Sequence, residues 1–109
     1  MSDCLFCKIV SGEIPAKIVT QTDLLVAFSD INPQAPQHVL IVPKEHVESL
    51  RDLKPAQAHL LGEMALMAQD LAQGQDFRMV MNTGSSAGQS VFHLHMHVLS
   101  GRNFAWPPG

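Results

Sequence analysis

The sequence predicts an α+β fold in which the helices cover one face of an antiparallel sheet. Five short segments rich in apolar and β-branched residues are separated by turns, loops or one longer segment, and strands connected by tight turns usually pair antiparallel. The longer segment repeats its apolar residues every three or four positions, which is the period of an amphipathic helix. We therefore expect a five-stranded antiparallel sheet with one long helix and a short N-terminal helix.

The N-terminal half is expected to hold the short helix and three of the strands. The helix spans residues 4–10 and ends where Ser11 and Gly12 follow it. Residues 30–36 contain two prolines, which exclude a regular element, so we expect a stiff loop there. Residues 44–50 are expected to form a helical turn. The three strands are expected at residues 17–21, 24–29 and 38–42.

The C-terminal half is expected to hold the long helix and the last two strands. Pro55 suits the first turn of the helix, where a missing N–H costs nothing, and Gly74 is expected to end it. A polar loop at 83–90 separates the two strands, and the tail at 102–109 is expected to be irregular. The apolar stripe of the helix consists of Leu60, Leu61, Met64, Met67, Ala68 and Leu71. The strands are expected at residues 77–82 and 91–99.

The composition limits the class of protein. A chain of 109 residues is expected to form a single domain, 1–109, and its hydrophobic fraction of 46% fits a globular protein better than a disordered one. The net charge of -3 argues against a nucleic acid polymer as partner, because no basic block is present to neutralise a phosphate backbone. A small phosphorylated ligand needs only a few local donors and stays possible.

The sequence also indicates a compartment. No apolar run approaches the length of a membrane span, and the N-terminus lacks the basic and apolar regions of a secretion signal. Two cysteines are too few for a disulfide scaffold. We therefore expect a cytoplasmic protein without a membrane partner.

The expected last strand carries three histidines at alternate positions, His93, His95 and His97. Successive side chains of a strand point to opposite faces, so the three imidazoles would share one surface while the apolar residues between them face the core. Imidazole can serve as nucleophile, acid–base group or metal ligand near neutral pH. A histidine-rich surface strand and a metal-binding tract are the alternatives. The residues expected to face the core are Phe92, Leu94, Met96 and Val98.

The segment just before this strand has the character of an anion site. Gly88 permits close approach of a ligand to the backbone, whose N–H groups can converge on an anion. The Gln89 amide and the Ser90 hydroxyl offer further donors. A phosphate bound there would lie beside the middle of the histidine row.

Cys4 and Cys7 form a second group of interest. Two thiolates at this spacing supply half of a tetrahedral zinc site. A redox pair is the competing interpretation, but it normally follows a strand, and three residues cannot form one. Of the other histidines, His38 is expected to be a hydrogen-bonded structural group, and His59 is expected to face solvent.

The motif His93-Leu94-His95-Met96-His97-Val98-Leu99 resembles the signature of the histidine triad (HIT) superfamily of nucleotide hydrolases and transferases. The ending Trp106-Pro107-Pro108-Gly109 is similar to that of its Hint branch, the purine nucleoside phosphoramidate hydrolases. The resemblance implies a HIT-like fold and a homodimer. It extends over Phe6-Cys7-Lys8-Ile9, Glu13-Ile14-Pro15-Ala16-Lys17, Ala27-Phe28-Ser29-Asp30-Ile31, Pro33-Gln34-Ala35-Pro36 and Gly88-Gln89-Ser90-Val91-Phe92.

The resemblance also implies roles for individual residues. His95 matches the nucleophile, whose other ring nitrogen is held by a backbone carbonyl, and His97 matches the residue that hydrogen-bonds the phosphate. Ser90 matches the residue near the leaving nitrogen, and Asp30 the acid that binds the ribose hydroxyls. The remaining nucleotide contacts implied are Phe6, Ile9 and Ile31 at the base, Asn82 at the ribose or phosphate, and Gly88 and Gln89 in the phosphate loop.

The implied activity is that of a purine nucleoside phosphoramidase. It would release AMP or GMP from phosphoramidates or acyl-nucleotides through a nucleotidyl-histidine, without a cofactor in the chemical step. His97 favours water as the final acceptor, because related transferases have glutamine there. The alternatives are a dinucleoside polyphosphate hydrolase of the sister branch and a non-catalytic AMP-binding regulator. Residues 100–109, with Trp106, would reach the site of the partner subunit.

Many members of the superfamily complete a zinc site with two histidines that match His46 and His93. The resemblance therefore implies a structural zinc on Cys4, Cys7, His46 and His93, which would brace the site without taking part in the reaction. The alternative is a pair of reduced buried thiols. In that case His93 could be catalytic, hydrogen-bonding His46 as a relay behind His95.

Overall fold

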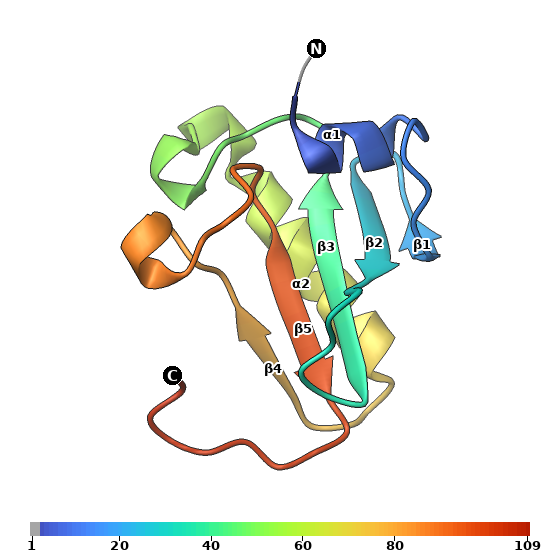
Figure 1. Cartoon of the computed structure of the whole chain (residues 1–109), viewed down its shortest axis with the longest axis vertical. Helices are drawn as coiled ribbons and strands as arrows, with labels where there is room; N and C mark the ends of the chain where they lie inside the picture. The colour runs from blue at the N-terminus through green and yellow to red at the C-terminus, as the bar shows by residue number, and fades with distance from the viewer. Residues whose placement is uncertain (1–2) are drawn as a thin grey trace.

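A computed structural model describes residues 3–109, in which five strands form one antiparallel sheet (Figure 1). The strand order is β1-β2-β3-β5-β4, so the last strand of the chain lies between two earlier ones. The predicted α+β fold with a five-stranded antiparallel sheet is confirmed. The strands are β1 (Ile18–Gln21), β2 (Leu25–Ser29), β3 (Gln37–Pro43), β4 (Phe77–Val80) and β5 (Met96–Ser100).

The two helices are α1 (Leu5–Val10) and α2 (His59–Ala72). Pro55 opens a short 3-10 turn ahead of α2, and α2 ends at Gln73, which has a left-handed backbone. The helical turn predicted at 44–50 is wrong, because the turn lies at Leu50–Asp52. Val47 is buried in the core, and its carbonyl accepts from the Leu94 N–H at 2.6 Å, which holds this segment extended.

The two helices pack on opposite faces of the sheet. Leu25 and Ala27 of β2 face Met64 of α2, which runs behind the sheet in Figure 1. Val26 and Phe28, which alternate with these residues along β2, face Phe6 of α1 on the opposite face of the sheet. This follows from the alternation of side chains along a strand. The prediction that all helices cover one face holds for α2 only, since α1 covers part of the histidine face.

The prediction that 91–99 forms one strand is wrong in its first half. The pairing between β3 and β5 ends at Ile41 and Met96, because Pro43 has no N–H with which to continue it. Only His97 of the three histidines therefore lies in a strand. Phe92, which was expected in the core, is 43% exposed. Leu94, Met96 and Val98 are buried as predicted.

Within residues 3–109, neither helix combines the length and the apolar character that crossing a bilayer requires.

Candidate active site

A pocket of about 770 Å³ opens on the face of the sheet opposite α2. It is walled on one side by α1 and the residues that follow it, and on the other by the ends of β2 and the loop before β5. Both apolar and polar side chains line it. Nine of the residues predicted to bind a nucleotide lie on its wall, namely Phe6, Ile9, Asp30, Ile31, Asn82, Gly88, Ser90, His95 and His97.

The His95 ring is held in one tautomer by the backbone. Its Nδ1 lies 2.7 Å from the carbonyl oxygen of His93. A carbonyl can only accept, so Nδ1 carries the proton and Nε2 keeps its lone pair. The ring is mostly buried and meets the Phe6 ring edge to face at 5.1 Å. The backbone carbonyl that the resemblance implied is confirmed, and Nε2 is the nitrogen left for a ligand.

The His97 ring is held through His38. The backbone N–H of Gln34 donates to His38 Nδ1 at 3.0 Å, so the neutral His38 ring carries its proton on Nε2. That Nε2–H donates to His97 Nδ1 at 2.9 Å. His97 therefore carries its own proton on Nε2. A hydrogen-bond donor and a lone pair are thus presented by neighbouring rings, whose centroids lie 5.1 Å apart.

The pKa directions agree with these neutral rings. Burial, followed by proximity to His95 and His38, lowers the pKa of His97 to about 4 against an opposing effect of Asp30. Burial also lowers the pKa of His38, again opposed by Asp30. Both rings are therefore uncharged near pH 7.

His38 is a site residue that the sequence argument missed. It is hydrogen-bonded as predicted and is buried, but it also contacts the triad directly. The pairing of β3 with β5 places Leu40 opposite His97 and His38 opposite Leu99, which makes His38 and His97 diagonal neighbours. Without the register of the two strands, no signal in the sequence joins these histidines.

Asp30 lies at the edge of this histidine pair. Its Oδ1 accepts from the Asn32 N–H at 2.8 Å, and its Oδ2 lies 3.4 Å from His38 Nε2. These contacts fix the carboxylate beside His38 and His97. Ile31, the next residue, is fully exposed at the pocket rim.

The loop before β5 packs closely on Asn82. Gly88 has a φ of +103°, and a Cβ there would lie 3.4 Å from Asn82 Nδ2. A residue other than glycine would be strained at this φ, while a Cβ would be in ordinary van der Waals contact with the Asn82 amide. Gly88 and Asn82 therefore lie side by side on the pocket wall.

The prediction that the Gln89 amide contacts a phosphate is wrong. Its Nε2 donates to the carbonyls of Glu48 and Val91, at 2.8 and 3.1 Å, and its Oε1 accepts from the Gly84 N–H at 2.9 Å. Both amide hydrogens are used and the side chain is buried. Gln89 braces the loop and does not line the pocket.

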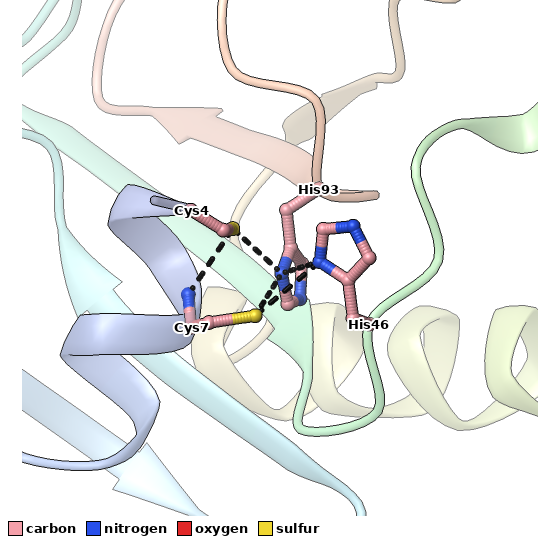
Figure 2. A group of neighbouring side chains, drawn as sticks. All are labelled: Cys4, Cys7, His46 and His93. Atoms are coloured by element: carbon pink, nitrogen blue, oxygen red, sulfur yellow. Dashed lines mark hydrogen bonds between the residues drawn. The ribbon is translucent and has the colours of Figure 1, made fainter. Parts of the chain in front are cut away.

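Four side chains converge beside α1, as Figure 2 shows, and could hold a metal ion. Cys4 Sγ lies 3.3 Å from His93 Nδ1, Cys7 Sγ lies 3.3 Å from His46 Nδ1, and the two Nδ1 atoms are 3.2 Å apart. Tetrahedral zinc needs about 3.6 Å between a sulfur and a nitrogen ligand and about 3.3 Å between two nitrogens. The spacing and the donor set therefore fit zinc.

His93 is oriented for this cluster and not for the pocket. Its Nε2–H donates to the Pro43 carbonyl at 2.8 Å, which turns Nδ1 toward the cysteines, and the ring is fully buried. Such a second hydrogen bond is typical of a metal-ligating histidine. The contact between the His93 and His46 rings that the relay alternative required is present, with their Nδ1 atoms 3.2 Å apart, and the link to His95 runs through the His93 backbone carbonyl. A catalytic role of His93 stays a prediction.

Asp30, His38 and His97 also lie close enough together to be considered as metal ligands. The 2.9 Å between the two ring nitrogens is a hydrogen-bond length, shorter than the edge of a zinc tetrahedron. His38 Nε2 also carries a proton, since Gln34 occupies Nδ1. This group is a hydrogen-bonded chain and does not fit a metal.

Trp106 lies in the tail and is 85% exposed. It is absent from the wall of the pocket of its own chain. Its contact with a partner subunit stays a prediction.

Comparison with known proteins gives one family. The HIT domain matches residues 11–104, a range that begins just after α1. An uncharacterized HIT-like protein of Synechocystis is 50% identical over 98% of this chain and 97% of its own length. Protein HitA of Neisseria gonorrhoeae is 44% identical over 91% of this chain and 96% of its own length.

Solved structures agree. A HIT family hydrolase from Legionella pneumophila superposes with a TM-score of 0.95 at 45% identity, covering 98% of this chain and all of that chain. A histidine triad protein from Clostridium difficile gives a TM-score of 0.91 at 41% identity and covers 96% of each chain.

The lowered pKa of His97 predicts a pH-dependent stability. At pH 7 the ring is neutral in both the folded and the unfolded chain. As the pH falls below 6.5, His97 is protonated in the unfolded chain, whereas in the folded chain its lowered pKa keeps it neutral until about pH 4. The free energy of unfolding should therefore fall across this window, by about 2 kcal/mol from this residue.

Urea unfolding of the wild type and of His97→Gln between pH 7 and 4.5 measures this contribution as the difference between the two slopes. The same change at His59, exposed at the start of α2, is the matched control for replacing an imidazole by an amide. Identical pH slopes for the wild type and His97→Gln would contradict the prediction.

Proposed function

Since this chain belongs to the HIT-domain family, we propose that it is a hydrolase of purine nucleoside 5′-phosphoramidates and acyl-nucleotides that releases AMP or GMP. The observation that carries the proposal is the His95 ring, whose Nδ1–H is held by a carbonyl while Nε2 is left for a ligand in a large pocket. A similar structure from Legionella pneumophila is a HIT family hydrolase. The Trp106-Pro107-Pro108-Gly109 ending supports the Hint branch.

The pocket supplies a complementary surface for each part of a nucleotide. Phe6 and Ile9 of α1 and the exposed Ile31 offer apolar area to a purine. The Asp30 carboxylate has acceptor capacity for ribose hydroxyls. The side chains proposed for the base are apolar, so no preference between adenine and guanine follows from them.

In the first step His95 Nε2 attacks the phosphorus and the bond from phosphorus to the leaving nitrogen breaks. The amine takes a proton from solvent through the Ser90 hydroxyl, which lies on the pocket wall. The His97 Nε2–H donates to a non-bridging oxygen and stabilises charge that grows in the transition state. A nucleotidyl-histidine results.

In the second step water attacks the same phosphorus, and the bond to His95 Nε2 breaks. The water proton passes to solvent, the nucleoside monophosphate leaves, and the nitrogen regains its lone pair. The His93 carbonyl stabilises positive charge on the ring throughout, because it keeps accepting from Nδ1–H. Splitting one displacement into two gives each step a good nucleophile or a good leaving group.

We further propose a structural zinc on Cys4, Cys7, His46 and His93. The donor set and spacing support it. Four protein ligands leave no open position, so the ion would act as a brace and not as a Lewis acid toward substrate. The brace would tie α1 to His93, whose carbonyl orients His95.

We also propose a homodimer. β4 is an edge strand, and along residues 3–109 no strand pairs with its outer side. Phe77 and Met79 on β4 are 37% and 45% exposed, and Leu66 on α2 is 58% exposed. An open edge with exposed apolar side chains favours pairing with a second copy by a two-fold axis.

The substrate assignment predicts a ranking. The kcat/KM for adenosine 5′-phosphoramidate should exceed that for diadenosine polyphosphates by at least about tenfold, and His95→Ala should lower kcat by about a thousandfold or more while the Kd for AMP changes by under about tenfold. The exposed His59→Ala is the matched control. Equal or better use of the polyphosphate would favour the sister branch, and AMP binding without turnover would favour a regulator.

The zinc proposal predicts about one zinc per chain in the purified protein, measured by atomic absorption. Replacing both cysteines, as Cys4→Ser with Cys7→Ser, should reduce the content to near zero. His46→Asn should lower it as well, because that ring supplies a ligand, while His59→Asn should match the wild type. Equal zinc in the wild type and the double variant would rule the site out.

The dimer proposal predicts a solution mass of about twice 11.9 kDa by light scattering. Met79→Asp should shift the protein toward the monomer, because a carboxylate would be buried in the interface. Val19→Asp introduces the same charge at a 46% exposed position on the opposite edge strand, and should leave the dimer intact. A monomeric wild type would contradict the proposal.

A further inference from the structure

The tail after β5, residues 101–109, packs against the loop that precedes β3, residues 30–36. Figure 1 shows both at the same end of the sheet. Gly101 has a φ of +97° and packs so closely on Pro36 that a Cβ would lie 2.9 Å from the proline Cβ. Arg102 then donates from Nε to the Gln34 carbonyl at 2.8 Å. The tail therefore anchors this loop from outside the pocket.

Arg102 is exposed but makes several contacts. Besides Gln34, its Nη1 donates to the Asn103 carbonyl at 2.9 Å, and its guanidinium lies 4.3 Å from the centroid of the Phe104 ring. Hydrogen bonds from a charged guanidinium are stronger than neutral ones, and stacking on an aromatic face limits its rotamers. These contacts restrict the Arg102 side chain to a conformation in which it donates to the Gln34 carbonyl.

Gln34 also helps to determine the tautomer of His38, together with the Asp30 carboxylate, whose Oδ2 lies 3.4 Å from His38 Nε2. Its N–H donates to His38 Nδ1, and His38 in turn donates to His97 Nδ1. A continuous path of three hydrogen bonds therefore runs from Arg102 through Gln34 and His38 to His97.

We propose that Arg102 is a positioning residue for His97, acting by holding Gln34 so that its N–H stays on His38. The consequence for catalysis rests on the proposed function, whereas the consequence for the tautomers does not. Arg102 touches neither the pocket nor the reacting atoms. It acts only through the backbone of Gln34.

The consequence of releasing Gln34 follows from hydrogen-bond direction. If its N–H leaves His38, that ring can take the proton on Nδ1 and present an unprotonated Nε2. His97 would then donate from Nδ1 to His38 and turn a lone pair, in place of an N–H, toward the pocket. A lone pair repels a phosphate oxygen. Both rings reverse together, since one bond joins them.

Long-range ¹H–¹⁵N NMR of the histidine rings near pH 7, without substrate, reads these tautomers directly. In the wild-type protein both His38 and His97 should carry the proton on Nε2. Arg102→Gln should convert a measurable fraction of both rings to the Nδ1–H form. Arg102→Lys keeps a charged donor and should restore part of the Nε2–H population.

Arg78→Gln is the matched control. Arg78 donates to the Ala105 carbonyl at 3.0 Å and lies 5.0 Å from the Phe104 ring, so it contacts the same tail without contacting Gln34. This variant should leave both tautomers as in the wild type. If Arg102→Gln leaves them unchanged, or if both arginine variants shift them alike, the positioning role is overturned.

Turnover of adenosine 5′-phosphoramidate supplies the second readout. Arg102→Gln should lower kcat by about three- to tenfold with KM changed by under about twofold, because the phosphate donor matters most in the transition state. Arg78→Gln should match the wild type. A wild-type protein that does not hydrolyse the phosphoramidate but shows the tautomer shift would overturn the proposed function and support the positioning role.

Discussion

The site depends on two backbone hydrogen bonds that fix the tautomers of its imidazoles. A peptide carbonyl only accepts and a peptide N–H only donates. The His93 carbonyl therefore places the proton of His95 on Nδ1, and the Gln34 N–H keeps the proton of His38 off Nδ1. From these two bonds follow a lone pair on His95 Nε2 and a donor on His97 Nε2. Both are prepared before a ligand arrives, so the protein need not reorganise them during a reaction.

The end of β3 makes the first of these bonds available. Pro43 cannot donate to a neighbouring strand, and the ladder between β3 and β5 stops at Ile41 and Met96. The segment before Met96 is thus released from strand pairing. The His93 ring takes the Pro43 carbonyl, and the His93 carbonyl is left for His95. A proline at the end of one strand accordingly determines where the proton sits on a ring of the next.

Local patterns in the sequence were sufficient for the sheet and for α2, because alternation and the three-to-four spacing are local properties. They were insufficient for residues 91–95, which alternate as a strand does. There the Leu94 N–H donates to Val47, a contact between distant segments that no local pattern encodes. The assignment of Gln89 failed, and the contact of His38 with the triad was missed, for the same reason. The direction of the Gln89 amide depends on the Glu48 carbonyl, and the role of His38 depends on strand register.

The residues that the sequence argument located best are those whose positions are joined by a short element. Cys4 and Cys7 flank Phe6 in the first turns of α1, a helix of six residues. The cysteines meet His46 and His93, while Phe6 meets His95 on the pocket wall. A rigid turn therefore carries the cluster ligands and the pocket wall together, and neither can shift without the other. His93 links the two, because its ring lies in the cluster and its backbone carbonyl accepts from His95 Nδ1. The cluster therefore stands one residue's backbone away from the proposed nucleophile, which explains why a group with no access to the pocket belongs to the same functional unit.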